Sequence, residues 1–427
     1  MPLRRLLSRV EILRPLAIRD FALLWTGMTV SLLGDGIYFV AIAWQVLELS
    51  NRPTALSIVG AAYVTPQVLL LLIGGVLTDR LERRRLMMVA DALRAVAIGA
   101  IGVLSVAGVL QLWEVVVLVA LFGVGDSLFG PAFTAIVPEI VPSEQLVQAN
   151  SLDHFVKPAT RLVGPALGGL LVAWAGPGTA FLVDAASFLA SFAALALMQT
   201  RRLPLREVEA SAWRELREGF EFVRRKTWLW GTLATAAFGN YVATATFVIV
   251  PYLVKNKLHG GAAQYGLIPV CGAIGGLISA LVVGQLGLPR RHVLAMYLTW
   301  GLGILGLAGY GASTRLVEML AISFAMGGLM TIGSVVWGTL MHRLVPQELL
   351  GRVSAFDWTL SIVLTPLGYA TLGPLAVAFG ASRTMIVAGI AGALVHFAFL
   401  LALPRLRDPE HDERMLADGA AARLQES

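Results

Sequence analysis

The sequence predicts an all-α membrane protein that crosses the bilayer many times. Hydrophobic residues make up 57% of its 427 residues, charged residues only 14%, and the mean hydropathy is +0.75. A water-soluble domain requires a larger charged surface than this. Stretches such as Val115 to Phe122 are apolar throughout, which favours helices over the alternating pattern of a membrane barrel. We therefore expect a polytopic bundle of membrane-spanning helices.

Twelve apolar segments are long enough to cross the hydrocarbon core, which requires about 20 helical residues. Basic residues precede the first segment as in a signal peptide, but the segment is too long for one and has no obvious cleavage site, so we expect it to be retained. The twelve segments lie at about 20–48, 55–78, 87–107, 113–138, 148–174, 178–199, 228–254, 264–287, 291–311, 316–341, 351–378 and 382–403.

Lysine and arginine residues are distributed unevenly between the connections. Most lie in the N-terminal segment, the even-numbered connections and the C-terminal tail, whereas the opposite side holds Arg52, Lys255, Lys257, Arg315 and Arg383. Because basic loops resist translocation, this distribution predicts that both termini are cytoplasmic. The net charge of +6 is accounted for by basic residues near anionic lipid headgroups. The bilayer is therefore an expected partner and nucleic acid is not.

A polar stretch divides the spans into two groups of six. The predicted parts are a cytoplasmic segment at 1–19, a six-helix bundle at 20–199, a cytoplasmic linker at 200–227, a second bundle at 228–403 and a cytoplasmic tail at 404–427. Within the linker, Trp213, Leu216, Phe220 and Val223 recur at helical spacing. This pattern predicts an amphipathic helix at the cytoplasmic interface, with an ordinary solvated linker helix as the alternative.

The two groups of spans are related in sequence. Val141-Pro142-Ser143-Glu144 recurs 204 positions later as Val345-Pro346-Gln347-Glu348. Such repeats predict a duplicated unit and two halves related by pseudo-twofold symmetry, as expected of a transporter whose site lies between related halves. The same offset relates Gly123 to Gly327, Asp153 to Asp357, Gly164 to Gly368 and Gly169 to Gly373.

The connection between the second and third spans, Gly75 to Met87, contains one aspartate and four arginines. It resembles the signature loop of major facilitator superfamily transporters, with Glu82 where the family usually has glycine. The resemblance implies that Gly75, Asp79, Arg80, Arg83 and Arg84 form a gating loop. Asp79 would contact the start of the eleventh span near Gly351 and Arg352, where a helix N-terminus favours an anion. Alternatively, the arginines only set the topology.

The matching connection of the second half keeps Arg290 and Arg291 but has Gln285 in place of Asp79. The acid is therefore the part of the loop that we predict to be functional. We expect Asp79→Asn to impair transport while leaving the topology intact. Transport assays and labelling of the two termini would check this, and unchanged transport would leave the loop as a topology signal alone.

Gly164-Pro165-Ala166-Leu167-Gly168-Gly169 lies inside the fifth span. Its glycines permit a close helix crossing, and its proline removes one backbone hydrogen bond. The string resembles the fifth-helix motif of antiporters of the superfamily. With the loop, the spans and the duplication, the resemblance covers about residues 18–404 and is strongest to the drug:proton antiporters that include macrolide and siderophore exporters. The fourth span lacks the arginine that many other proton antiporters of the superfamily place there.

Asp35 and Asp126 are predicted to lie well inside the first and fourth spans without a partner in their own helix. An ionised carboxylate is costly there, so both are candidates for exchanging protons or binding a cationic substrate. The alternative is that the backbone or a basic residue of another helix satisfies them. Asp184 and Asp357 are further candidates, and Asp357 is predicted to lie nearer the cytoplasmic end.

Two local acid–base pairs are also predicted. Asp153 lies four residues before Lys157, a spacing that favours an ion pair; the pair has either a structural role or one in handling protons or substrate. Asp91 and Arg94 are one turn apart in the third span and are interpreted as a structural pair.

The resemblance to the major facilitator superfamily implies that the first, fourth, seventh and tenth helices line the cavity. Aromatic walls with few polar anchors suit an amphipathic molecule better than a sugar, although each aromatic could instead pack against a neighbouring helix. The polar and aromatic residues on those helices, which we take as cavity candidates, are Asp35, Tyr38, Asp126, Asn240, Tyr241, Thr244, Ser334 and Trp337.

The resemblance to drug:proton antiporters implies a secondary transporter of the cell membrane that exports small amphipathic organic compounds by proton antiport with alternating access, and we expect it to function as a monomer. A dedicated exporter of a single siderophore or secondary metabolite is the alternative. A membrane-embedded enzyme is disfavoured because the sequence contains no nucleotide loop, metal-ligand cluster or nucleophile–base pair. The lone Cys271 excludes an internal disulfide, and we expect neither a cofactor nor a metal.

Overall fold

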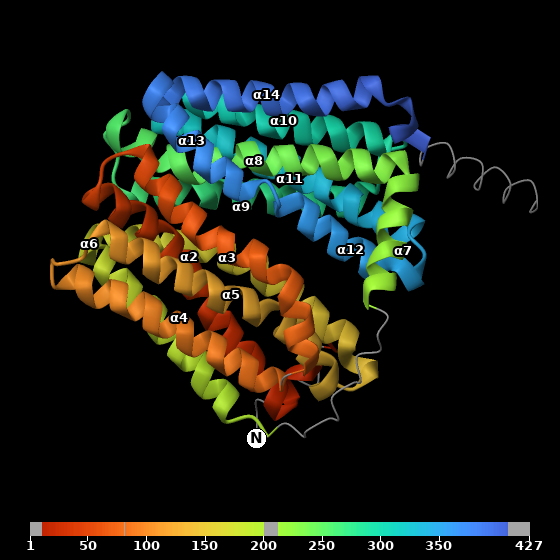
Figure 1. The fold of residues 1–427 in the computed structure, drawn as a ribbon, viewed down its shortest axis with the longest axis horizontal. Helices are drawn as coiled ribbons and strands as arrows, with labels where there is room; N and C mark the ends of the chain where they lie inside the picture. Colours follow the sequence, from red (N-terminus) through yellow and green to blue (C-terminus); the bar gives the residue numbers. More distant parts are fainter. Residues whose placement is uncertain (1–10, 81, 200–211, 409–427) are drawn as a thin grey trace, which may run out of the picture. The chain divides into compact units, whose positions relative to one another are not determined.

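The computed structural model describes residues 11–80, 82–199 and 212–408, those at 71–80 and 212–216 by their backbone alone. This part of the chain is helical, with short connections and no strand (Figure 1). Its elements are η1 (Glu11–Ala17), α2 (Arg19–Leu49), α3 (Pro53–Arg80), α4 (Arg83–Val106), α5 (Leu112–Ile140), η2 (Ser143–Gln145), α6 (Leu146–Ala196), α7 (Ala212–Arg225), α8 (Thr227–Asn256), α9 (Ala262–Leu286), α10 (His292–Ala312), α11 (Leu316–Leu344), α12 (Gln347–Ile362), α13 (Thr365–Phe379), α14 (Ala381–Ala402) and η3 (Pro404–Arg407).

Eleven segments of the described chain are long and apolar enough to cross a membrane. One of them, Ser143–Ala196, has 54 residues, far more than one crossing needs. Gly176 interrupts it with non-helical angles (φ 80°, ψ 165°), and Pro177 follows. Glycine adopts this positive φ without a steric penalty, and proline starts the next helix without an N–H. Division at Gly176 gives two crossings, so the described chain contains the twelve predicted spans.

The eleventh span, predicted at 351–378, is present but interrupted. Helix α12 ends at Ile362, and α13 begins at Thr365 with proline in its first turn. The ring of Pro366 has no N–H to donate to the carbonyl of Ile362, so one helical hydrogen bond is lost at the point where the helix is interrupted. The interruption lies directly after Asp357 and Ser361, which line the pocket described below.

The chain divides into two compact units. Unit 1 comprises Met1–Val208 and Val250–Val270, and unit 2 comprises Glu209–Ile249 and Cys271–Ser427. The end of α8 and the start of α9 therefore belong to unit 1. The predicted division at the linker placed both segments in the second bundle.

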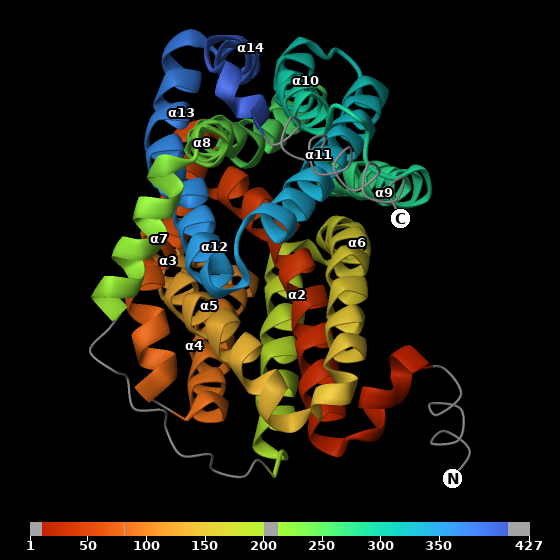
Figure 2. The ribbon, with the colours of Figure 1, turned by 90° about the vertical axis from the view of Figure 1, so that its right-hand side faces the viewer.

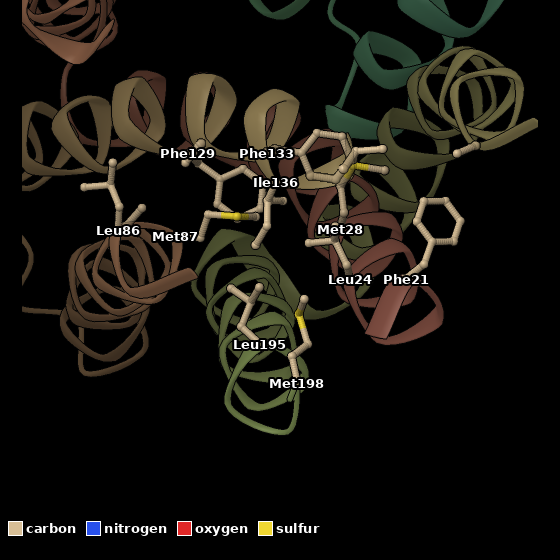
Figure 3. Packing of buried hydrophobic residues seen from close by; sticks show 14 of the residues in the cluster. Phe21, Leu24, Met28, Leu86, Met87, Phe129, Phe133, Ile136, Leu195 and Met198 are labelled. Carbon is tan, nitrogen blue, oxygen red and sulfur yellow. The ribbon is translucent and has the colours of Figure 1, made fainter. Parts of the chain in front are cut away.

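An apolar cluster holds α2, α4, α5 and α6 of unit 1 together. Side chains from all four helices meet there with little exposure to solvent (Figure 3), and their burial away from lipid and water fixes the helix contacts by close packing. The labelled members are Phe21, Leu24, Met28, Leu86, Met87, Phe129, Phe133, Ile136, Leu195 and Met198.

Two helix pairs characterise unit 2. Helices α10 and α14 run side by side, and α7 crosses α12 and packs against it (Figures 1 and 2). In the second pair the Phe220 and Phe356 rings lie 6.1 Å apart, and Arg352 Nη1 lies 2.6 Å from Glu218 Oε2. The linker therefore contains the predicted helix, and this helix contacts α12 through both an apolar and a charged residue.

Candidate functional site

A buried arginine organises the polar interior of unit 1. Arg94 of α4 is 2% exposed, and its guanidinium forms an ion pair with the fully buried Asp91 one turn earlier. Arg94 Nη1 also lies 3.6 Å from Asp126 Oδ1 of α5. The guanidinium lies over the rings of Phe129 and Phe188, 4.3 and 4.6 Å from their centroids, which adds cation–π attraction. The predicted local pair is present, but Arg94 also reaches a second helix.

Asp126 receives partners from two neighbouring helices. The Tyr63 hydroxyl and the Gln67 amide of α3 donate to Asp126 Oδ2 at 2.9 and 3.0 Å, while Arg94 faces the other oxygen. Gly125 makes this possible, because a Cβ there would lie 2.8 Å from Arg94 Cγ. The base that the fourth span lacks is therefore supplied by the third, and the side chain of Asp126 remains one-third exposed.

Two more carboxylates approach the same guanidinium. Asp184, in the second half of α6, is fully buried and accepts a hydrogen bond from Ser187 at 3.3 Å. Both side chains lie against Gly34 of α2, where any side chain would collide with them. The neighbouring Asp35 interacts electrostatically with Arg94, with Asp126 and with Asp184, and its Oδ1 is buried without a hydrogen-bond partner.

We call Asp35, Asp91, Arg94, Asp126 and Asp184 the charge cluster. It contains four carboxylates and a single base from the described part of the chain, within segments that cross the membrane. Four carboxylates beside one guanidinium leave an excess of negative charge, which is costly at low dielectric when all four are ionised. The arrangement is suited to binding and releasing protons.

The other predicted proton-coupling acid of unit 1 lies in a separate place. Asp153 Oδ2 lies 2.6 Å from Lys157 Nζ, as the spacing predicted. Lys157 also lies near the ring of Phe133, 5.9 Å from its centroid. Asp153 thus has its own counter-charge, and no interaction joins it to the charge cluster among the described residues.

The glycines of the fifth-span motif form two close contacts. Gly164 and Gly168 lie against Gly36 and Ile37 of α2: a Cβ on Gly164 would lie 2.7 Å from Gly36 Cα, and one on Gly168 would lie 2.9 Å from Ile37 Cα. Gly169 faces the start of α9, where Ala262 O would be 3.0 Å from a Cβ. Pro165 is buried in the same crossing. The motif therefore lets α6 approach α2 and α9 at backbone distance.

The described arginines of the predicted gating loop connect the start of α4 to two other helices. Arg83 forms an ion pair with Glu139 at the end of α5. Arg84 donates to Leu195 O and Ala196 O, both at 2.7 Å, at the last turn of the second part of α6, where carbonyls lack helical partners. Gly75, Asp79 and Arg80 lie outside the residues whose side chains are described.

Unit 2 contains a pocket of about 390 Å³ that is lined mainly by apolar and aromatic side chains. Asn240, Ser334 and Trp337, all predicted cavity residues, line this aromatic pocket together with Asp357. Trp337 Nε1 donates to Asp357 Oδ2 at 3.1 Å. The sequence did not single out its other aromatic and sulfur-containing walls, which are Trp300, Trp358, Met326 and Met330.

The remaining cavity candidates lie elsewhere. The Tyr241 hydroxyl is 2.9 Å from Thr371 Oγ1 of α13, and Thr244 packs against Gly368 of the same helix, so both are at a helix contact. Tyr38 is 8% exposed and packs on Phe122 at 4.7 Å between centroids. These three residues therefore pack against neighbouring helices and do not line the pocket of unit 2.

Comparisons with known proteins agree with this architecture. The chain is 30% identical over 410 residues to the multidrug efflux pump Tap of Mycolicibacterium fortuitum, covering 92% of this chain and 97% of that protein. It is 22% identical to macrolide efflux protein A of Streptococcus pyogenes over 86% of this chain and 92% of that protein. The nucleoside transporter NupG has the same fold, with a TM-score of 0.70 at 9% identity over 90% of this chain and 100% of that one.

The sequence profile of the transmembrane secretion effector family matches residues 11–418, nearly the whole chain. Together with the membrane-length helices and the paired charges inside them, this match identifies a transporter rather than an enzyme. The chain belongs to the transmembrane secretion effector family of the major facilitator superfamily and is a multi-pass membrane protein.

Proposed function

We propose that this protein exports small amphipathic organic compounds in exchange for protons. The charge cluster carries the proposal, because carboxylates that outnumber their counter-ions inside an apolar bundle bind protons reversibly. The names of the relatives Tap and macrolide efflux protein A support the direction of transport.

In the proposed mechanism, protons bind to Asp35 and Asp126 from outside the cell and leave to the cytoplasm. When Asp126 is ionised, it shares Arg94 with Asp91 and accepts bonds from Tyr63 and Gln67. Protonation removes that negative charge and weakens the link between α5 and the helices α3 and α4. A proton can drive transport only if the two conformations bind it unequally, and we propose that they differ in this link between α5 and the helices α3 and α4.

Everted membrane vesicles test the proposal. With an acidic interior, vesicles containing the wild-type protein should accumulate a fluorescent organic substrate such as ethidium. Asp126→Asn and Asp35→Asn should each lower this uptake by roughly 5- to 150-fold, the range of typical coupling energies.

The matched control is Glu144→Gln, which removes an exposed carboxylate of η2 in the same unit and should leave uptake unchanged. Dissipating the proton gradient should abolish uptake by the wild type. Proton-driven uptake that survives in both aspartate variants would refute the coupling role of the cluster.

A further inference from the structure

The aromatic pocket of unit 2 has walls from α8, α10, α11, α12 and α14. The Trp300 and Trp337 rings lie 6.5 Å apart between centroids, and Trp358, Met326 and Met330 complete the apolar surface. Its volume of about 390 Å³ is within the range of small-molecule sites, roughly 300–1,000 Å³. Indole faces attract cations, and methionine adapts to irregular apolar shapes.

Most polar side chains of the pocket already donate to the protein. Asn240 Nδ2 donates to Ser361 O at 2.8 Å, Ser334 Oγ to Met330 O at 2.9 Å, and Trp300 Nε1 to the same carbonyl at 3.3 Å. A sugar or another polyhydroxylated compound would lose its water there and gain few partners in return. The pocket therefore selects a ligand with a mainly apolar body.

Asp357 is the exception, because it offers a carboxyl group without a counter-ion. Its oxygens accept hydrogen bonds from Trp337 Nε1 at 3.1 Å and Ser361 Oγ at 3.4 Å. Both donors are neutral, and no basic side chain of the described residues forms an ion pair with Asp357. The acids of the charge cluster, in contrast, share Arg94. A carboxylate held in place in an aromatic pocket is complementary to a cation.

We propose that the aromatic pocket binds the transported compound as a monovalent organic cation with a bulky aromatic or apolar body, and that Asp357 supplies its counter-charge. This inference rests on the proposed export of amphipathic compounds and names the class that the site accepts. In this proposal the positive charge of the substrate is bound in unit 2, while the charge cluster of unit 1 binds and releases protons.

Equilibrium binding to the purified full-length protein tests the inference, with radiolabelled tetraphenylphosphonium as the probe. Tetraphenylborate, which has the same shape and the opposite charge, should compete poorly. Asp357→Asn should weaken probe binding about tenfold or more, because it removes the charge and keeps the side-chain shape. Asp357→Glu should stay within a few-fold of wild type, and the exposed Glu348→Gln on the same helix should change nothing.

A second variant tests the location without altering charge. Ala243 lines the pocket, and Ala243→Phe should fill it and weaken probe binding about tenfold or more. Equal affinity in wild type and Asp357→Asn, no loss in Ala243→Phe, or no saturable binding to the wild type would each overturn the inference. Because this assay contains no proton gradient, its outcome is independent of whether transport proves to be proton-driven.

Discussion

Replacing Arg94 by methionine should abolish transport and destabilise unit 1 by about 3–5 kcal/mol, the cost of removing one partner from a buried ion pair. Arg94 is 2% exposed and compensates Asp91, which is fully buried, as well as Asp126. Without the guanidinium these carboxylates must take up protons or draw water into the bundle. In either case Asp126 no longer alternates between an ionised form paired with Arg94 and a protonated form, and the proposed mechanism depends on that alternation.

The matched control for this prediction is Arg161→Met on α6, because Arg161 is exposed and forms no ion pair with the described residues. Thermal unfolding of the purified variants in detergent should show a large loss for Arg94→Met and little change for Arg161→Met. Arg94→Lys should be intermediate, since lysine keeps the charge but not the planar fork. Equal unfolding midpoints for the two methionine variants would contradict the central role of Arg94.

The local features of the chain were predictable because helix geometry determines them. The Asp153–Lys157 and Asp91–Arg94 pairs follow from residues three or four apart lying on one face. The break near Gly176 follows from glycine and proline between two apolar segments. Such features require no knowledge of which helices are neighbours.

The spacing of residues along the sequence does not predict which helices contact one another. Asp126 lacks a base in α5, and its partners Tyr63, Gln67 and Arg94 come from two other helices. The clearest available signal was Arg94 itself, because an arginine inside an apolar span is rarely retained for one local pair. The pocket walls Trp300 and Trp358 were missed for a similar reason, since they lie on helices that the cavity assignment did not include.

Substituting alanine for Gly164 should destabilise the protein by about 1–3 kcal/mol, as expected when a side chain is forced into a filled contact. The new Cβ would lie 2.7 Å from Gly36 Cα, and a Cβ on Gly36 would lie 2.6 Å from Gly164 Cα. Backbone atoms cannot move aside by changing rotamer, so α2 and α6 must separate. Because Asp35 precedes Gly36, the separation should also displace it from Arg94 and lower proton-driven uptake.

Gly130→Ala is the matched control, because nothing lies within 4 Å of a Cβ at this helical position of α5. Like Gly164, Gly130 precedes a proline, so both alanine variants carry the same local cost, and Gly130→Ala should lose much less stability than Gly164→Ala. Pro165→Ala separates two explanations of the fifth-span motif. If the motif acts by close packing, Gly164→Ala should lower the unfolding midpoint and uptake more than Pro165→Ala. If it acts by bending α6, the proline variant should have the larger effect, because only proline removes a backbone hydrogen bond.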